Sequence, residues 1–593
     1  MNQIKKLGKY KMHLSSITIK NFKSIKDFTF LLTEYTPLVG YNNAGKSNIL
    51  EAIKWLLNKS SLDKTYFNTT DSPIEISGRV EGISEEILSQ LPTAQRNSIA
   101  PYIIDEKLDI KRVQPTPSVP VKNINLEVKK VNETNWTANR NGLDAALKSL
   151  FPEPIEIAAM ENAAEDAGKF KTTTTIGKLI AEIMAPIEEN HTTAITEALN
   201  SLKNKFEADG NDRATELTNF DTEATAKLQE YFPGISIKLH VPTPIIKEVF
   251  KGGTLKVYEN EIGRELTSYG HGTQRSVQMT LIQHLADIKR GTESRASNTL
   301  LLIDEPELYL HPQAIEQVRS GLKVLAQNGY QVVFTTHSPQ MIPSEDIKHT
   351  LLVRKNETEG THARERLINA VQEAEAEAVS QFELLFSLEN ANQILFSEKV
   401  LLAEGKTEKR LLPYIYNKYH NKTLGQSKIA FTELGGSANT YKSMLVLNRM
   451  NLPCKAIVDL DFAFKEASRN GLLQDGQSDS DFLICKNKFS ENSDISLSED
   501  GLPKKDGFLT ASQAYEWLAE QTDVQENIQN LHEKLKSKNV WLWTKGAIEK
   551  HLSLTSKTEQ AWALFKRRLY REEFDDVITD EYVISLLEWL EEV

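Results

Sequence analysis

Alternating and unbroken runs of apolar residues divide this chain into predicted strands and helices. From Leu14 to Phe22 apolar and polar positions alternate, with Ile17 and Ile19 on one face, which predicts a β-strand. Elsewhere short apolar runs bounded by turn residues predict buried strands, and helical spacing follows several of them. The predicted strands lie at 14–22, 37–39, 74–76, 235–241, 254–258, 300–303, 331–335, 399–403, 456–458 and 540–543. This order of strands and helices indicates an α/β fold.

The stretch 155–232 follows a helical pattern instead. Ile176 and Ile180 begin a three-to-four spacing that Pro186 interrupts and that resumes as far as Phe206. The segment carries no strand pattern and is rich in Ala, Glu and Thr. Two interpretations fit it equally: a helical arm used for self-association, or a helical subdomain packed on its own core.

Two further stretches differ from their surroundings. Pro-rich 115–120 separates two alternating stretches, and we interpret this region as a β-meander insertion. The acidic, Ala-rich stretch from about 364 to 392 has few apolar positions and is expected to be a helical connector. No repeat of the solenoid kind is visible.

Composition narrows the class of protein. The 593 residues, 40% hydrophobic and 26% charged, are typical of a globular protein of several domains. No apolar run approaches the roughly 18 residues of a membrane span, and no apolar segment follows the basic start, so we expect a cytoplasmic protein without a membrane partner. Cys454 and Cys485 supply neither a disulfide framework nor a zinc spacing. The net charge of −12 leaves nucleic-acid binding open, because binding needs only a local basic track.

One motif predicts a phosphate-binding loop. Residues 40–47 read GYNNAGKS, which matches G-x-x-x-x-G-K-[ST] between a predicted strand and a predicted helix. The glycines let the backbone N–H groups surround a triphosphate; Lys46 would reach the β- and γ-phosphates, and Ser47 would hold Mg²⁺. The residues assigned to nucleotide binding here are Gly40, Asn43, Gly45, Lys46, Ser47 and Asn48.

Later residues complete an ATPase pattern. Asp304 ends an apolar strand and is expected to bind Mg²⁺, and Glu305 beside it would act as general base toward the attacking water. His337, at the end of a neighbouring strand, is a candidate contact of the γ-phosphate. A helix opens after the sequence SYGHGTQ, whose Ser268, Gly270 and Gly272 form a second candidate anion site.

This order of motifs resembles the ABC-type ATPases of the SMC and RecF kind. The resemblance implies that the signature helix of one protomer closes over ATP held by the other, so that ATP lies at a dimer interface. The signature of this chain, which contains Ser268, Gly270 and Gly272, departs from the LSGGQ form and reads SYGHGTQ.

An acidic set follows in the C-terminal third. Glu404 and Asp459 each follow an apolar strand; Glu408 lies four residues after the first, and Asp461 two residues after the second. Residues at i and i+2 of a strand project to one side, so the two aspartates can converge. Carboxylate oxygens suit Mg²⁺ or Mn²⁺, which can activate water and stabilise the leaving oxygen of a phosphodiester.

The spacing E-G-x-T-E followed by D-x-D resembles a TOPRIM domain, a Rossmann-like fold found in topoisomerases, primases and nucleases. The resemblance implies a further acid after a later strand, for which Glu549 is the candidate metal ligand. It also implies an assisting basic residue, for which we assign Lys566 in the sequence FKRR. Each assignment has a non-functional alternative. The acids could be surface carboxylates that cap helices, and Lys566 could lie on a solvated helix face.

An SMC/RecF-type ATPase followed by a TOPRIM domain resembles the OLD (overcoming lysogenization defect) family of nucleases, which includes the nuclease subunit of the Gabija antiphage system and retron-associated effectors. The resemblance implies a dimer or higher oligomer that cuts or nicks DNA with divalent metal under nucleotide control, in defence against phage. It further implies a partner, a helicase for Gabija or an RNA–DNA hybrid for retrons. The predicted domains are 1–154 and 233–363 for the ATPase, 155–232 for a dimerisation insertion, 364–395 for the connector and 396–593 for TOPRIM.

Other functions remain open at this point. A DNA-repair or DNA-clamping ATPase with a non-catalytic TOPRIM module would share the same motifs. A primase usually carries a zinc-binding region, which two distant cysteines do not supply, and a topoisomerase needs a nucleophilic tyrosine that does not stand out among the 17 present. An ABC transporter subunit predicts no acidic C-terminal site.

Overall fold

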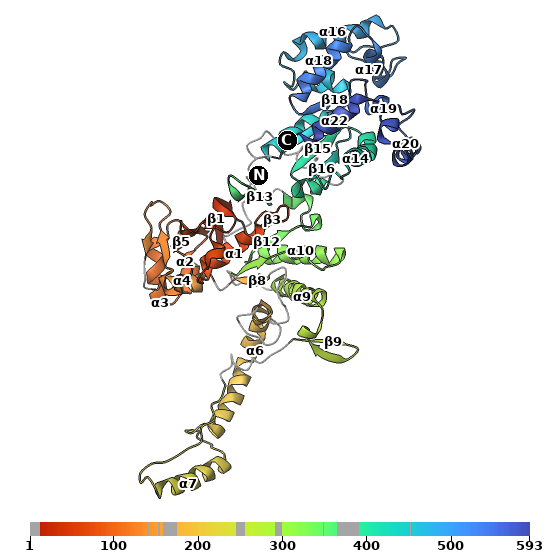
Figure 1. The fold of residues 1–593 in the computed structure, drawn as a ribbon. Coiled ribbons are helices and arrows are strands. Elements are labelled where there is room, and N and C mark those ends of the chain that lie inside the picture. Colours follow the sequence, from red (N-terminus) through yellow and green to blue (C-terminus); the bar gives the residue numbers. More distant parts are fainter. Residues whose placement is uncertain are drawn as a thin grey trace. The chain divides into compact units, whose positions relative to one another are not determined.

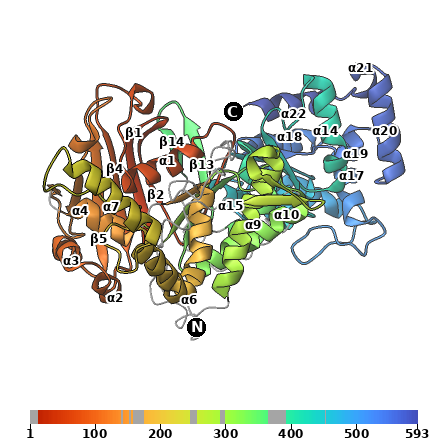
Figure 2. The same cartoon turned by 90° about the horizontal axis from the view of Figure 1, so that it is seen from below.

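The computed structural model describes residues 12–138, 142–151, 154–157, 175–244, 255–290, 299–347, 349–363, 391–450 and 452–592. They belong to two units: Met1–Thr36 with Ser47–Met341, and Pro37–Lys46 with Ile342–Val593 (Figures 1 and 2). The chain therefore passes from one unit to the other at both ends of the segment that contains the phosphate loop. Within the described ranges no helix is long and apolar enough to cross a membrane.

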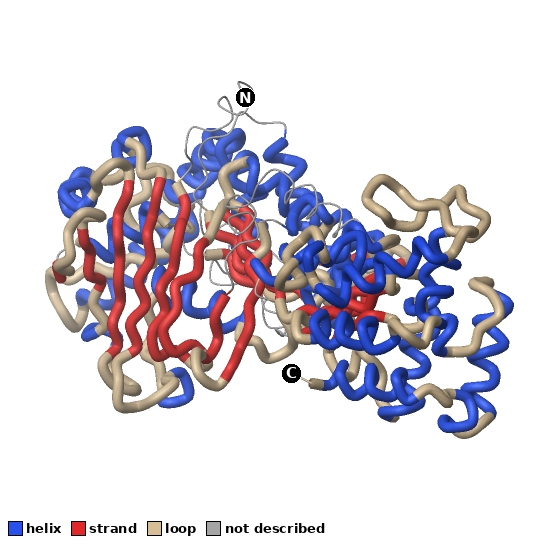
Figure 3. Tube along the Cα trace, turned by 90° about the horizontal axis from the view of Figure 1, so that it is seen from above, coloured by secondary structure: helices blue, strands red, loops and turns tan. Residues whose placement is uncertain are grey.

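An antiparallel layer begins the first unit (Figure 3). Its strands in spatial order are β7 (Thr137–Ala138), β6 (Leu126–Lys129), β5 (Lys107–Gln114), β4 (Ile74–Glu81), β1 (His13–Phe22) and β2 (Ile25–Leu31). Ile17 and Ile19 of β1 are fully buried, as their alternation predicts. The meander interpretation holds for β5 and β6, but these strands extend the layer and do not form a separate insertion.

Helix α1 (Lys46–Leu57) packs on this layer through the apolar face that its spacing predicts. Ile49, Ile53 and Leu56 are fully buried. A Cβ at Gly78 of β4 would lie 2.9 Å from the Leu56 side chain, so glycine permits the close approach of helix and strand. Three shorter helices cover other parts of the unit: α2 (Glu85–Ser89), α3 (Thr93–Ile99) and α4 (Leu143–Leu150).

A parallel group of strands forms the other part of the first unit. Strand β11 (Leu300–Ile303) is buried along its whole length between β8 (Ile155–Ile157) and β12 (Gln331–Thr336), as expected of a parallel strand. Helices α9 (His271–Arg290) and α10 (Pro312–Gln327) belong to the same part. Strand β8 corrects the expectation that helical sequence starts at 155: Ile155–Ile157 pairs with β11 before the helical segment begins.

The helical segment consists of α6 (Thr175–Phe206) and α7 (Thr215–Gln229), and α6 runs through the position of Pro186 without a break. The alternation at 235–241 is not a strand, which corrects that prediction. The segment instead lies extended along α7, where Thr225 Oγ1 and Asp221 Oδ1 accept the N–H groups of Ile237 and Leu239. A hairpin of β9 (Lys256–Glu259) and β10 (Ile262–Glu265) follows.

The second unit contains two groups of strands. The end of β3 (Tyr35–Val39) pairs in parallel with β13 (Leu351–Asn356), which pairs antiparallel with β14 (Gly360–Ala363). A four-stranded parallel sheet follows, in the order β16 (Ile429–Glu433), β15 (Lys399–Ala403), β17 (Cys454–Val458) and β18 (Val540–Leu542). The predicted connector falls mostly on residues 364–390, which lie outside the described residues.

The parallel sheet is covered by helices and by an aromatic core. The core includes Trp541, Trp543, Trp562 and Trp589, all of them buried. The helices are α14 (Lys406–His420), α15 (Thr440–Arg449), α16 (Ser480–Lys488), α17 (Ala511–Glu520), α18 (Gln525–Lys536), α19 (Ile548–His551), α20 (Glu559–Arg571), α21 (Phe574–Val577) and α22 (Glu581–Glu591).

A buried histidine in this core should make its stability depend on pH. His532 is 1% exposed beside Trp541, and its Nδ1 lies 2.5 Å from the Tyr582 hydroxyl. Burial lowers the pKa of His532 to about 4. The folded state therefore favours neutral His532, whereas the unfolded chain binds a proton below its pKa near 6.5. The free energy of unfolding should be unaffected by this group above pH 6.5 and should fall by up to about 3 kcal/mol as the pH falls toward 4.

We expect the difference in unfolding free energy between wild type and His532→Phe to shrink as the pH falls from 7.5 to 5, measured by urea unfolding at each pH. The comparison with the variant is needed because other buried acids in this unit change stability with the opposite sign. A difference that stays constant with pH would contradict the prediction.

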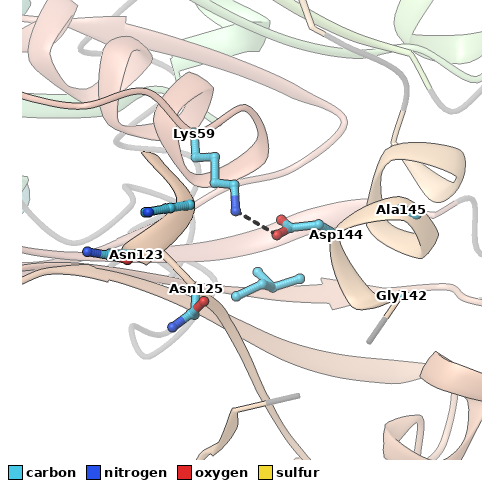
Figure 4. Close-up of a pocket in the computed structure, with 8 residues that line it drawn as sticks. Lys59, Asn123, Asn125, Gly142, Asp144 and Ala145 are labelled. Carbon is cyan, nitrogen blue, oxygen red and sulfur yellow. Dashed lines mark hydrogen bonds and ion pairs between the residues drawn. The ribbon is translucent and has the colours of Figure 1, made fainter. Parts of the chain in front are cut away.

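A buried arginine in the first unit depends on one carboxylate. Arg112 of β5 is 1% exposed and donates to Leu56 O at 2.6 Å and to Asp144 Oδ1 at 2.5 Å. Lys59 donates to Asp144 Oδ2 at 2.9 Å on the wall of a polar cavity of about 600 Å³ (Figure 4). Burial raises the pKa of Asp144, but the charge of Arg112 and the hydrogen bonds from Lys59 and Arg112 outweigh it, so the pKa lies below its ordinary value.

Asp144→Ala is expected to lower the free energy of unfolding of the first unit by about 3 kcal/mol, because it leaves the Arg112 charge buried without its partner. Asp27→Ala, which breaks the exposed pair with Lys20, should change it by less than about 1 kcal/mol. Calorimetric unfolding measures both, and equal shifts for the two variants would contradict the assignment.

Candidate functional site

The phosphate loop has the backbone that its glycines permit. A Cβ at Gly40 would meet Val353 O at 2.3 Å, and Gly45 has a φ of +96°, a conformation that side chains other than glycine rarely adopt. The Lys46 ammonium donates to Gly40 O at 3.0 Å and Tyr41 O at 3.1 Å, inside the curve of the loop. A lysine held there can exchange these carbonyls for phosphate oxygens.

The predicted magnesium ligands come together next to this loop. Ser47, the residue after Lys46, donates its hydroxyl to Asp304 at 3.1 Å (Oδ1) and 2.9 Å (Oδ2). Asp304 directly follows β11, and Thr335 of β12 also donates to it. The sequence separates Ser47 from Asp304 by 257 positions, so the contact supports the predicted pair directly.

Glu305 and His337 also lie side by side. His337 Nε2 is 3.4 Å from Glu305 Oε1, and both side chains are about 30% exposed. Glu305 has a φ of +49°, and Arg275 of α9 donates to the carbonyls of Asp304 and Glu305 at 2.7 Å each. The backbone that carries the candidate general base is therefore fixed by a buried arginine, which sequence analysis did not single out.

The remaining nucleotide candidates lie apart from this pair. Ser268, Gly270 and Gly272 lie around the start of α9, and a Cβ at Gly270 would meet no atom within 4 Å. Within the described part of the chain, no hydrogen bond joins these three residues to Ser47 or Asp304. Asn43 has a φ of +66° in the loop. Asn48 donates to the Ser24 hydroxyl at 2.7 Å, which gives it a structural partner between β1 and β2.

The acidic set of the second unit gathers at one edge of the parallel sheet. Glu404 follows β15 and Asp459 follows β17, which are neighbouring parallel strands. The Asp459 N–H donates to Glu404 Oε2 at 3.1 Å. Asp461 accepts from Lys465 Nζ at 2.7 Å, while its Oδ1 is buried without a hydrogen-bond partner in the described structure.

A cavity of about 260 Å³ opens beside these acids, between the starts of α14, α19 and α20. Trp543 Nε1 donates to Glu408 Oε1 at 3.0 Å, and Thr407 Oγ1 donates to Glu549 Oε1 at 2.5 Å. Lys557 Nζ lies 3.2 Å from Glu549 Oε2. The residues that line the cavity are Gly405, Lys406, Thr407, Glu408, Asp459, Glu549, Lys557 and Trp562.

Mutual repulsion in this cluster perturbs its titration. Burial, then Asp461 and Glu408, raise the pKa of Glu404 to about 8, and burial with Glu549 raises the pKa of Glu408 to about 7. Burial and the charges of Glu404 and Glu408 raise the pKa of Asp459 well above its ordinary range, although Lys557 opposes the shift. Carboxylates crowded together in this way, with Glu408 and Glu549 buried, need compensating positive charge, which protons or a metal ion can supply.

The donor set fits a hard divalent cation. All five candidate ligands are carboxylates, which Mg²⁺ and Mn²⁺ prefer. Three of them, Glu408, Asp459 and Glu549, line the cavity. As the side chains stand, no group of three or more His, Cys, Asp or Glu in the described residues converges closely enough to hold an ion. Metal binding would therefore require rotations of these carboxylates.

The structure does not place Lys566 at the cavity, and another lysine lies there instead. Lys566 lies with its ammonium 4.2 Å above the ring of Tyr414 and does not line the cavity. Lys557, nine residues earlier, occupies the position that was expected of Lys566. Lys557 belongs to no sequence motif, and only its distance of eight residues from Glu549, across a short turn, could have indicated it.

Comparison with protein families identifies both halves of the chain. A family described as "AAA ATPase domain" matches residues 12–155 and 119–342. A family described as "Overcoming lysogenization defect protein-like, TOPRIM domain" matches residues 395–461, the part that contains Glu404, Glu408, Asp459 and Asp461. The predicted fold class, an α/β ATPase followed by a TOPRIM domain, is confirmed, and use of a nucleotide and a divalent metal follows from these domains.

The relatives that match most of the chain are described as nucleases or endonucleases. The chain is 36% identical over 555 residues to the Old nuclease of Escherichia phage P2, which covers 91% of this chain and 92% of that protein. It is 25% identical to the endonuclease GajA of Bacillus cereus strain VD045, over 69% of this chain and 68% of that one. It is 21% identical to the OLD nuclease of Thermus scotoductus, over 76% and 82%.

Proposed function

The chain belongs to the OLD (overcoming lysogenization defect) family of nucleases, and from this premise we propose that it is a DNA endonuclease or nickase controlled by nucleotide. The proposed metal is Mg²⁺ or Mn²⁺, the substrate is double-stranded DNA, and the biological role is defence against phage. The observation that carries the proposal is the carboxylate cluster at the carboxyl ends of β15 and β17, beside a cavity that Lys557 also lines.

Each residue of the cluster has a proposed role. Glu404, Asp459 and Asp461 would hold one metal position, and Glu408 and Glu549 would extend the site across the cavity. A divalent metal bound there would activate water and stabilise the leaving oxygen of the phosphodiester. Lys557 would pair with a phosphate oxygen, because its ammonium already lies against the acids that face the cavity. Trp562 forms part of the wall of the cavity.

The nucleotide site would set when cleavage occurs. Lys46 would hold the phosphates, Ser47 and Asp304 the metal of the nucleotide, and Glu305 with His337 would act at the γ-phosphate. Ser268, Gly270 and Gly272 would meet the nucleotide of a second copy, since within the described residues no hydrogen bond joins them to Ser47 or Asp304 of their own chain. Binding and hydrolysis of ATP would then change how two nuclease sites are presented to DNA.

The helical segment supports assembly with a second copy. No residue of α7 is buried. Nine large apolar side chains between residues 202 and 241 are exposed, namely Leu202, Phe206, Phe220, Tyr231, Phe232, Ile235, Ile237, Leu239 and Val241. A segment that buries so little of its own apolar surface is expected to bury it against a partner. We therefore assign it to dimerisation and not to a subdomain with a separate core.

The alternative function is a DNA-clamping ATPase whose TOPRIM module does not cut. It shares the nucleotide site but requires no metal in the second unit. The raised pKa values of Glu404 and Glu408 favour the nuclease, because a module that only binds DNA gains nothing from buried, mutually repelling carboxylates.

The deciding experiment incubates supercoiled plasmid with the purified protein and Mg²⁺, Mn²⁺ or EDTA, each with and without ATP. We expect nicked or linear product only with metal, and a change in rate when ATP is added. Absence of product with every metal, at a protein concentration that retards DNA on a gel, would support the clamp instead.

Replacement of Lys557 by Met should lower the rate of cleavage by about 100-fold, because the phosphate loses the cation that the cavity wall offers next to Glu549. Lys566→Met is the matched control, since it removes the same charge outside the cavity and should change the maximal rate by less than about threefold. Single-turnover cleavage measures both. An equal loss of cleavage rate in the two variants would contradict the role proposed for Lys557.

A further inference from the structure

We propose that the paired exposed faces of α14 and α20 form a binding surface for the phosphate backbone of duplex DNA, which leads into the acidic cavity. This surface, the basic ridge, consists of Lys406, Arg410, Tyr414, Lys566, Arg567 and Arg571. The inference rests on the proposed nuclease function and adds to it where the substrate lies.

The face of α14 beside α20 is cationic and aromatic at regular spacing. Lys406, Arg410 and Tyr414 follow each other at four-residue intervals and therefore lie along one side of the helix. All three are exposed. Lys406 also lines the cavity, so this row begins at the candidate catalytic site.

Helix α20 packs beside this row and runs in the same direction. Arg410 contacts Glu559 at 2.9 Å near the start of α20, and the Lys566 ammonium lies over Tyr414 one turn further along α14. Trp562, Phe565 and Leu569 are buried and fix which face of α20 points outward. Both helices begin at the cavity, and Figures 1 and 2 show them as neighbours at the edge of the second unit.

The outward face of α20 has a charge opposite to that of the whole chain. The helix contains four basic residues and one acid, in a chain of net charge −12. Arg567 and Arg571 are exposed one turn apart, and neither forms an ion pair within the described ranges. Tyr570 between them is 87% exposed. A merely solvated face would not need uncompensated arginines around an exposed aromatic ring.

The length of the ridge suits a nucleic-acid backbone. From Lys406 to Tyr414 the helix rises by roughly 12 Å, at about 1.5 Å per residue. Duplex DNA rises about 3.4 Å per base pair, so the ridge spans roughly three to four phosphates of one strand. The starts of both helices point their positive dipole ends at the cavity, where a phosphate would be cut.

The test uses binding without cleavage. An Asp459→Ala protein is titrated against a fluorescent 40-base-pair duplex, by anisotropy, at several salt concentrations. In this background Arg567→Glu with Arg571→Glu should weaken binding at least 10-fold near 0.1 M salt. It should also reduce the slope of log K against log salt by about two, because each phosphate contact contributes about 0.9.

The matched control reverses two exposed charges at the opposite edge of the same sheet. Arg449 ends α15 shortly before β17, and Lys538 lies two residues before β18; neither forms an ion pair in the described structure. Arg449→Glu with Lys538→Glu changes the net charge equally and should alter binding by less than about threefold. Equal weakening by both pairs, or an unchanged slope for the α20 pair, overturns the proposal.

Two further readouts separate causes of failure. Arg567→Gln with Arg571→Gln removes the charges without adding acids, and should reduce the slope likewise; it decides the question if the glutamate pair fails to fold. In the active background, cleavage by the α20 variants should fall through a raised KM with kcat retained. If the wild-type protein cuts DNA and the α20 variants have the same KM, the basic ridge does not bind the substrate. If the wild-type protein never cuts DNA, the proposed function itself is wrong.

Discussion

Asp459→Ala should abolish cleavage of plasmid DNA, with a loss of at least about 1,000-fold in rate, while nucleotide binding by the first unit is unchanged. Asp459 follows β17, and its backbone N–H holds Glu404, so the side chain lies between the acids that follow β15 and those around the cavity. Its removal leaves neither side of the cluster with enough carboxylate to hold a divalent ion.

The same substitution makes a second, opposite prediction. Because burial and neighbouring negative charge raise the pKa of Asp459 so strongly, the metal-free protein should be as stable without this carboxylate or more so. Melting curves in EDTA would show a transition that is unchanged or higher. Asp494→Ala, an exposed carboxylate in the same unit, should leave both cleavage and melting unchanged. Full cleavage by the Asp459 variant would remove the basis for a metal site here.

Local sequence patterns were sufficient to locate a candidate site residue wherever that residue directly follows a buried strand or belongs to a motif that does. The phosphate loop and the acid after each buried strand could be assigned because parallel strands bring their carboxyl ends to one edge, which explains the meeting of Ser47 with Asp304 and of Glu404 with Asp459. The same rule could not find Lys557 or Arg275. Lys557 reaches its site from a turn and Arg275 from the side of a helix. The residues around each of them in the sequence do not indicate where that turn or helix lies in the fold.

Alternation was misleading in one place for a physical reason. Residues 235–241 alternate as a strand does, but their N–H groups find Thr225 and Asp221 on α7 and no neighbouring strand. Their apolar side chains remain 43–51% exposed. A pattern that would normally indicate a buried face thus identifies the surface that we assign to a second copy, because a sequence does not distinguish burial within a chain from burial between chains.

Glu305→Gln should slow ATP hydrolysis by about 100- to 10,000-fold while nucleotide affinity is retained, because the amide cannot accept the proton of the attacking water. The surroundings of the carboxylate suit a general base, since it is partly exposed, lies 3.4 Å from His337 Nε2, and follows Asp304, whose oxygens accept from Ser47. Steady-state phosphate release and binding of a fluorescent ATP analogue measure the two properties separately.

Glu307→Gln is the control that distinguishes loss of a catalytic group from loss of a structural contact. Glu307 Oε1 accepts from Thr336 Oγ1 and from the N–H groups of His337 and Ser338 at 2.7–3.2 Å, and so it fixes the loop that carries His337. Its replacement should lower the melting temperature as well as turnover, whereas Glu305→Gln should lower turnover alone. If the Glu305 variant turns over ATP at the wild-type rate, the water is activated by another group, and Glu305 is not the general base of the gate that we propose for the nuclease.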